Sequence, residues 1–485
     1  MRFFSTRNEK NTSTFKEAVL KGIADEGGLY VPEHFPRIDL PKLLEMDYME
    51  MAHGILSCFT DLSEEELWTS IKDAYKKFPL IPAPLRKTSD LYYLELYHGP
   101  TLAFKDFALS ILPKFMEYSI KSLTPDSKVL ILTATSGDTG SAALEGFSGL
   151  SGIDIGVFFP QEGISQIQKL QMVTNPASNT FVAGIKGNFD DAQSAVKEIF
   201  TDAEFIAKLK ADGINLSSAN SINIGRLLPQ IVYYFYAYKE MVVSEQIALG
   251  DHVSFSVPTG NFGDILAGYY AKEMGLPINK FLVASNENKV LTDFFTTGVY
   301  DKNRNLKVTN SPSMDIIVSS NLERLLYHKT KDAALVARLQ DSLKTTGKFE
   351  LKADFSEFHP GFCNQDDTLA TIRKVYEEDG YLIDTHTAVA ANVAKMYLSS
   401  GASEKIIVLS TASPYKFSDS IMEALELSKL ADPFDNLMLI EAATGLTVPS
   451  QLLDLKKAKI NHNTVIDKDE IKNTVEKFIG DRNEG

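Results

Sequence analysis

Residues 253–270 read VSFSVPTGNFGDILAGYY, which joins an apolar strand pattern, a glycine-containing turn and the start of a helix. The β-branched and aromatic residues at 253–257 predict a strand, and the apolar run at 265–270 predicts a helix. Similar strand-like runs at 128–132, 153–159, 280–283 and 405–409 are each followed by a turn and a helix-like stretch. This repeated β-α-β order predicts an α/β fold with open, mostly parallel sheets and helices on both faces.

The first 90 residues have a mostly helical pattern that prolines interrupt repeatedly, so they differ from the rest of the chain. We therefore predict three regions. Residues 1–90 form a mostly helical N-terminal unit, residues 91–124 and 226–485 form a large α/β domain, and residues 125–225 form a small α/β domain.

Composition limits the classes of protein that this chain can belong to. Its 485 residues are 44% hydrophobic and 23% charged, which is typical of a globular protein. The net charge of −15 argues against binding of nucleic acid or an anionic membrane. The negative charge of the whole chain would also repel a phosphate ligand at long range. A site for such a ligand therefore needs cations close to it.

Cysteines and hydropathy indicate the compartment. Two cysteines, Cys58 and Cys363, are too few for a disulfide framework, and the N-terminus lacks the apolar segment of a secretion signal, so we expect a cytoplasmic protein. The most apolar stretch, 227–243, contains Pro229 and Lys239, and we interpret it as a buried helix. No histidine or cysteine spacing indicates a metal site.

Two loops are expected at the carboxyl ends of strands, where α/β proteins bind ligands. The turn at 260–264 can close its backbone N–H groups around a phosphate, although the same sequence also makes ordinary turns. The loop at 133–140 offers Ser136 and Thr139 for anion binding, or merely as helix caps. Asp138 is unfavourable in such a loop unless it is a hydrogen-bond partner of another group.

Lys105 stands between aromatic residues, in the segment AFKDF at 103–107, at an expected helix start. Burial and the helix dipole both disfavour the charged form of such a lysine, and an uncharged amine is a nucleophile. The alternative is a lysine whose stem passes Phe104 and Phe107 and whose amine reaches water.

Two cations follow segments that are expected to lie at the ligand-binding edge. Arg226 ends the polar segment 220–226, and Lys416 follows the strand at 405–409. Either residue can bind a phosphate or be a solvated surface group, and Lys169 and Lys186 are alternative cations.

Taken together, these segments resemble threonine synthase, a family of pyridoxal-phosphate enzymes with the fold of the tryptophan synthase β subunit. The resemblance spans about residues 2–440. One departure is that Ser413 and Tyr415 replace a histidine and an alanine that are common in the family. The segments are GGLYVP (27–32), HGPTLAFKD (98–106), LTATSGDTG (132–140), NSIN (220–223), GNFGD (260–264) and TASPYKF (411–417).

The resemblance implies a fold of the pyridoxal-phosphate type II class and the conversion of O-phospho-L-homoserine and water to L-threonine and phosphate, the last step of threonine biosynthesis. It implies that Lys105 is the Schiff-base lysine, that Thr411 faces the pyridine nitrogen and that Asp138 faces the ring oxygen of the cofactor. The remaining implied cofactor residues are Gly260, Asn261, Phe262, Gly263 and Asp264, and the expected substrate residues are Ser136, Gly137, Thr139, Asn220, Ser221, Arg226 and Lys416.

Two alternatives remain at this stage. One is a related pyridoxal-phosphate phospholyase or dehydratase of the same fold, and the other is a non-catalytic protein that binds a phosphorylated metabolite. In each case we expect a small-molecule ligand, no metal ion, and a monomer or homodimer.

Overall fold

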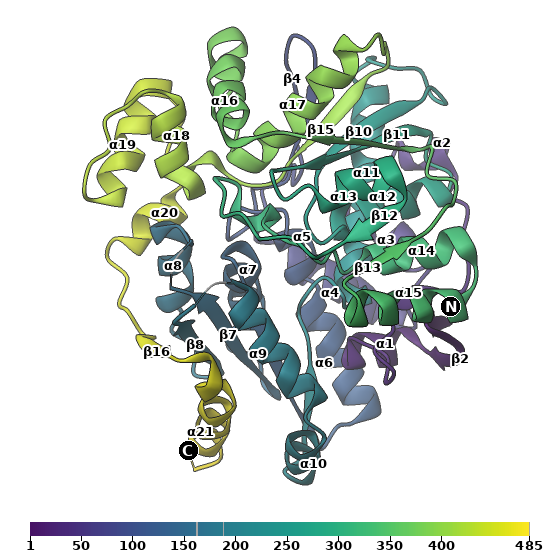
Figure 1. Ribbon diagram of the computed structural model, residues 1–485, viewed down its shortest axis with the longest axis vertical. Helices are drawn as coiled ribbons and strands as arrows, with labels where there is room; N and C mark the ends of the chain where they lie inside the picture. The colour runs from purple at the N-terminus through teal and green to yellow at the C-terminus, as the bar shows by residue number, and fades with distance from the viewer. Residues whose placement is uncertain (162, 188, 485) are drawn as a thin grey trace.

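Two parallel sheets form the body of the computed structural model, which describes residues 1–161, 163–187 and 189–484 (Figure 1). In the larger sheet all neighbouring strands are parallel except the pair β4 and β5. Its strands, in spatial order, are β14 (Phe358–Phe362), β11 (Ile278–Ser285), β10 (Val253–Pro258), β15 (Ile406–Ser410), β5 (Tyr92–Glu95) and β4 (Leu85–Lys87).

The smaller sheet has five strands, and all of its neighbouring strands are parallel. Every residue of β7 is buried, as is typical of a parallel strand that helices cover on both faces. The predicted strands coincide with β6, β7, β10, β11 and β15, so the predicted fold class is confirmed. The spatial order is β16 (Thr464–Ile466), β8 (Thr180–Ile185), β7 (Ile153–Pro160), β6 (Lys128–Ala134) and β9 (Ile214–Ser217).

Helices separate and cover the sheets. The stretch interpreted as a buried helix lies in α11, whose side chains are buried along most of its length although Pro229 lies inside it. Within the described part of the chain, no helix is both long and apolar enough to cross a membrane. The helices from residue 106 to 273 are α5 (Asp106–Leu109), α6 (Leu112–Leu123), α7 (Asp138–Phe147), α8 (Gln166–Val173), α9 (Phe189–Thr201), α10 (Ala203–Ala211), α11 (Ile224–Val243) and α12 (Gly263–Glu273).

The C-terminal half continues this pattern. Helix α17 packs against β10, β11 and β15 of the larger sheet. The remaining elements are α13 (Val290–Thr297), β12 (Val299–Asp301), η1 (Pro312–Met314), α14 (Leu322–Thr330), α15 (Ala333–Thr345), β13 (Lys348–Glu350), α16 (Gln365–Asp379), α17 (Thr385–Ser399), η2 (Pro414–Phe417), α18 (Ser418–Ala424), α19 (Pro433–Thr444), α20 (Ser450–Leu455), η3 (Lys468–Glu470) and α21 (Ile471–Glu484).

The N-terminal region is helical in α1 (Phe15–Lys21), α2 (Leu40–Leu43), α3 (Tyr48–Leu56) and α4 (Glu64–Tyr75), but it also contains a three-stranded antiparallel sheet. This sheet consists of β1 (Phe3–Ser5), β2 (Asn8–Ser13) and β3 (Tyr30–Pro32). The sequence pattern did not indicate β2, because its residues NEKNTS are polar and mostly exposed.

The division into three regions remains a prediction, and the sheets differ from it at two places. Strand β4 lies inside residues 1–90 but pairs with β5 of the larger sheet. Strand β16 lies inside residues 226–485 but pairs with β8 of the smaller sheet. Figure 1 shows the chain crossing from α20 to β16 and α21, so the C-terminal segment packs on the smaller sheet.

Candidate functional site

A cavity of about 1220 Å³ lies where the carboxyl ends of strands from both parallel sheets meet. Residues 134–136 and 138–139 line it after β6, residues 258–264 line it after β10, and Thr411 lines it after β15. Lys105, Ser221 and Arg226 also line this cavity. The structure therefore brings most of the predicted site residues together, as expected for loops that leave parallel strands at the same edge.

Lys105 is the residue that precedes α5, and its side chain is 13% exposed. Its Nζ lies 3.6 Å from Asp138 Oδ2 and 4.8 Å from the centre of the Phe104 ring. Burial lowers the pKa of the Lys105 amine, and the neighbouring cations Arg226 and Lys416 lower it further, while Asp138 opposes the shift. The alternative interpretation, in which the Lys105 amine reaches water, does not match this buried position.

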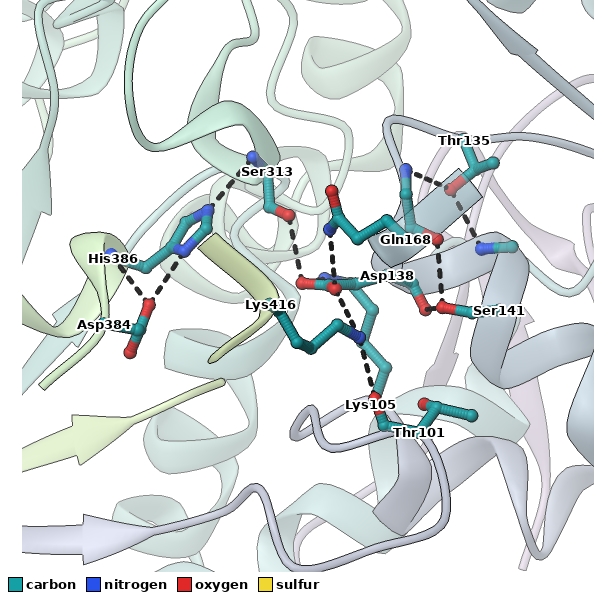
Figure 2. A network of polar contacts seen from close by, with 12 residues as sticks. Thr101, Lys105, Thr135, Asp138, Ser141, Gln168, Ser313, Asp384, His386 and Lys416 are labelled. Atoms are coloured by element: carbon teal, nitrogen blue, oxygen red, sulfur yellow. Dashed lines mark hydrogen bonds and ion pairs between the residues drawn. The ribbon is translucent and has the colours of Figure 1, made fainter. Parts of the chain in front are cut away.

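Asp138 begins α7 and is the centre of the polar network in Figure 2. Its Oδ1 accepts hydrogen bonds from Lys416 Nζ at 2.8 Å and Gln168 Nε2 at 2.9 Å, and its Oδ2 accepts one from Ser313 Oγ at 3.2 Å. Burial alone would raise the pKa of this carboxyl, but Lys416 and Lys105 hold the pKa well below its usual range. Asp138 is therefore an ionised carboxylate that faces Lys105.

Lys416 lies in a different place from the one that the sequence suggested. Its side chain is completely buried, and its Nζ donates to the carbonyl oxygen of Thr101 at 2.7 Å as well as to Asp138. It is not among the residues that line the cavity. This geometry does not match the expected contact between Lys416 and a substrate phosphate, because the Lys416 amine is paired with the Asp138 carboxylate.

The sequence analysis missed His386, Asp384, Ser313 and Gln168. His386 Nδ1 lies 2.9 Å from Asp384 Oδ1, and His386 Nε2 accepts the backbone N–H of Ser313 at 3.1 Å (Figure 2). Because Nε2 accepts, Nδ1 carries the proton and donates it to Asp384. The one local signal was Asp384 before a helical run, since it caps the N-terminus of α17.

In the loop at 260–264 the carbonyl groups of Gly260 and Asn261 accept hydrogen bonds, whereas the backbone N–H groups have no acceptor within the described part of the chain. Ser319 Oγ donates to the Gly260 carbonyl at 2.8 Å, and the Asn321 backbone N–H and Nδ2 both donate to the Asn261 carbonyl at 3.0 Å. Among the described residues, no acceptor is recorded for the backbone N–H groups of residues 260–264. They lie at the N-terminus of α12 and line the cavity, which is the arrangement that binds an anion.

Glycine is required at position 260 for space. A Cβ added to Gly260 would lie 2.9 Å from the backbone oxygen of Ser313, closer than real contacts allow. At Gly263 the added Cβ would meet the Ser221 Cβ at 3.3 Å. Phe262 has a left-handed backbone (φ 62°) and is buried, so the loop is held by its side chain as well.

Asp264 and Arg226 each keep a buried polar atom without a partner among the described residues. Asp264 Oδ1 accepts from the hydroxyls of Tyr233 at 2.6 Å and Tyr234 at 3.0 Å, whereas Oδ2 has no partner. Burial raises the pKa of Asp264 to about 6. Arg226 Nη1 donates to the Ala219 carbonyl at 2.9 Å, but its Nε has no acceptor, and burial lowers its pKa to about 10.

The other predicted residues occupy the walls or the support of the cavity. Ser136, Thr139, Asn220 and Thr411 line it, and Ser221 Oγ accepts a hydrogen bond from Asn321 Nδ2 at 3.0 Å. Gly137 does not line it. Its N–H donates to Thr135 Oγ1 at 3.0 Å, and a Cβ there would lie 2.5 Å from the Gln168 side chain.

Comparisons with known proteins find relatives that match most of this chain. Residues 2–75 match the family model described as threonine synthase N terminus, and residues 387–479 match the model described as threonine synthase, C-terminal. Threonine synthase of Pseudomonas aeruginosa is 38% identical over 437 residues, covering 87% of this chain and 90% of that protein. Human threonine synthase-like 1 is 39% identical over 94% of this chain, which spans 65% of that longer protein.

A solved structure has the same architecture over its whole length. The pyridoxal-phosphate-bound threonine synthase of Brucella melitensis superimposes with a TM-score of 0.86 at 38% sequence identity, covering 99% of each chain. The similarity therefore extends beyond the cavity to both parallel sheets and the N-terminal region.

Proposed function

This chain belongs to the threonine synthase family, and from that premise we propose that it converts O-phospho-L-homoserine and water to L-threonine and phosphate with pyridoxal phosphate as its cofactor. The observation that carries the proposal is the buried amine of Lys105, held beside an ionised carboxylate in the cavity where a row of free N–H groups also lies. Lys105 would hold the cofactor through its Nζ, and residues 260–264 would bind its phosphate.

The residues present fit such a cofactor. The N–H groups of residues 260–264 would supply positive ends for the cofactor phosphate, and the unpartnered Nε of Arg226, in the same cavity, would supply one for the substrate phosphate. The bound cofactor supplies an electron sink for charge that develops beside the amino group of the substrate. Thr411 would offer a neutral hydroxyl to the cofactor, and Asp138 would offer a negative charge.

Lys105 is then the group that holds and moves protons. Burial lowers its pKa and so favours the uncharged amine, in which Nζ can accept the α proton of the substrate and, once it has released that proton, the β proton. Asp138 lies 3.6 Å away and stabilises the ammonium form that results from each transfer. Ser136 and Thr139, at the start of α7, would orient the substrate carboxylate.

The test of the reaction is product analysis with purified holoenzyme. Threonine and phosphate in equal amounts are the expected products. Release of 2-oxobutyrate in place of threonine would identify a phospholyase or dehydratase instead. A protein without the visible absorbance of lysine-bound cofactor would be a binding protein.

We expect Gly260→Ala to weaken cofactor binding by about tenfold to a hundredfold. The added Cβ must displace the backbone at Ser313 or the loop itself, which weakens a charge-assisted hydrogen bond to phosphate of about 1.5–3 kcal/mol. The measurement is a titration of the cofactor-free protein with pyridoxal phosphate. Gly54→Ala is the matched control, because nothing lies within 4 Å of its added Cβ. Equal affinities of both variants would contradict the proposed phosphate loop.

We expect Arg226→Ala to lower kcat/KM by roughly tenfold to a few hundredfold while the cofactor spectrum changes little. Loss of one charge-assisted hydrogen bond to the substrate phosphate has this size. Inhibition by inorganic phosphate should weaken in parallel. Arg373→Ala, a change at a surface ion pair with Glu426, is the control. Unaltered kcat/KM and phosphate inhibition in Arg226→Ala would remove Arg226 from the phosphate site.

The location and the assembly stay proposals as well. The low cysteine content supports a cytoplasmic protein, and a monomer or homodimer remains our expectation. Size-exclusion chromatography with light scattering decides between the two assembly states.

A further inference from the structure

The cavity has a charge balance opposite to that of the chain. Eight basic and five acidic side chains line it, whereas the whole chain has 49 basic and 64 acidic residues. The side chains that line the cavity therefore carry a net positive charge in an acidic protein.

The acidic side chains of the cavity are already occupied. Asp25 pairs with Lys21 at 3.3 Å, Glu323 with Arg7 at 2.7 Å, and Asp138 with Lys416 at 2.8 Å. Asp264 accepts from two tyrosine hydroxyls, and Glu26 accepts from Asn11 Nδ2 at 2.7 Å. Three of the five carboxylates are therefore paired with cations, whereas Asp264 and Glu26 accept from neutral groups and keep their negative charge.

Three lysines of the cavity have no recorded ion pair within the described ranges: Lys210, Lys302 and Lys344. They come from separate parts of the fold. Lys210 is on α10, which packs against β9 of the smaller sheet, and Lys344 is on α15, which packs against β13 and β2. Lys302 follows β12, and its backbone N–H donates to the Gly347 carbonyl at 2.8 Å.

We propose that Lys210, Lys302 and Lys344 form a cationic vestibule that attracts phosphate dianions to the cavity. The inference rests on the proposed function, because the substrate and one product of that reaction are dianions near neutral pH. The net charge of −15 indicated that the chain as a whole does not attract an anionic ligand at long range. The distribution of charge reverses that conclusion, because salt screens charges beyond about 10 Å at 0.1 M ionic strength, so an approaching ligand responds mainly to the nearest side chains.

The size of the effect follows from Coulomb's law in water. For a dianion about 10 Å from each lysine, removing three charges should lower kcat/KM about fivefold at 0.1 M ionic strength and about twentyfold at 0.01 M. The effect should be small above about 0.5 M, where the screening length is only a few ångströms. The substitutions should change kcat/KM, because the lysines act while the ligand approaches the cavity.

The experiment compares two triple variants that change the net charge equally. Lys210→Gln/Lys302→Gln/Lys344→Gln removes the vestibule. Lys121→Gln/Lys457→Gln/Lys459→Gln removes three exposed lysines that do not line the cavity. For each holoenzyme, kcat/KM is measured from 0.01 to 0.5 M ionic strength, and the affinity for inorganic phosphate is measured by calorimetry over the same range.

A fall confined to the vestibule variant and removed by salt is the expected result. Equal falls in both triple variants would show that only net charge matters, and a fall that persists at high salt would show direct contact instead of steering. Either result overturns the proposal. If the wild-type protein makes no threonine, the proposed function fails separately, and the phosphate affinities still decide the vestibule.

Discussion

Replacing Lys105 by alanine is expected to lower threonine formation by at least about a thousandfold while the fold is retained. The variant loses both the amine that would hold the cofactor and the group that would move the α and β protons, and positioned proton transfer alone contributes about 10²- to 10⁴-fold. The fold should survive because Lys416, Gln168 and Ser313 still satisfy Asp138. The measurements are threonine release, the visible absorbance of bound cofactor and the melting temperature.

Two further variants make this result specific. Lys105→Arg keeps a cation beside Asp138 but provides no amine for a Schiff base, so it should be as inactive as the alanine variant. Lys114→Ala, which removes a partly exposed lysine of α6, should retain activity within about twofold. If Lys105→Ala kept more than a few per cent of wild-type turnover, Lys105 would not be the catalytic amine.

Replacing Lys416 by methionine is expected to lower the free energy of unfolding by about 3–5 kcal/mol. Breaking a buried ion pair from one side leaves a poorly compensated charge, here the carboxylate of Asp138, whose remaining cation Lys105 lies farther away at 3.6 Å. A lysine that only binds substrate would instead affect stability by less than about 1 kcal/mol. Urea unfolding, with the midpoint and slope of each transition, provides the comparison.

A second substitution separates charge from packing. Asp138→Asn in the Lys416→Met background removes the carboxylate that has lost its nearest cation, so it should recover part of the lost stability, although catalysis should fall further. Lys374→Met, at a surface pair with Glu378, should change stability by about 0.5 kcal/mol or less. A Lys416→Met variant as stable as this control would return Lys416 to its predicted role at the substrate.

The pH dependence of the Asp138 contribution has a definite sign. The pKa of Asp138 in the folded protein is lower than its ordinary value of 3.8, so its ion pairs stabilise the protein at all pH values above about 4. This contribution is lost only as the pH falls through the lower pKa of the folded state. The stabilisation by this pair is therefore constant between pH 5 and 8, and Asp138 adds no pH dependence to the free energy of unfolding in that range.

The sequence by itself determined the class of fold, the family and the position of the catalytic candidate. Parallel strands that are buried on both faces are continuous apolar runs. The strands at 153–159 and 253–257 could therefore be predicted without knowing which strands they pair with. Each strand end then placed its loop at the ligand-binding edge. The aromatic neighbours and the helix start of Lys105 made a buried amine one of two interpretations. These are local properties, because they depend on residues within a few positions of one another.

Only the tertiary structure decided how the charges of the site are balanced. Lys416 is 315 positions from the Thr101 carbonyl that it binds, and Ser313 is 175 positions from Asp138, so no spacing in the sequence indicates either contact. The same holds for His386, for the strand β16 that joins the smaller sheet, and for the vestibule lysines. Whether a charged side chain has an ion-pair partner depends on which distant segments the two sheets bring together, and this is fixed only in the packed tertiary structure.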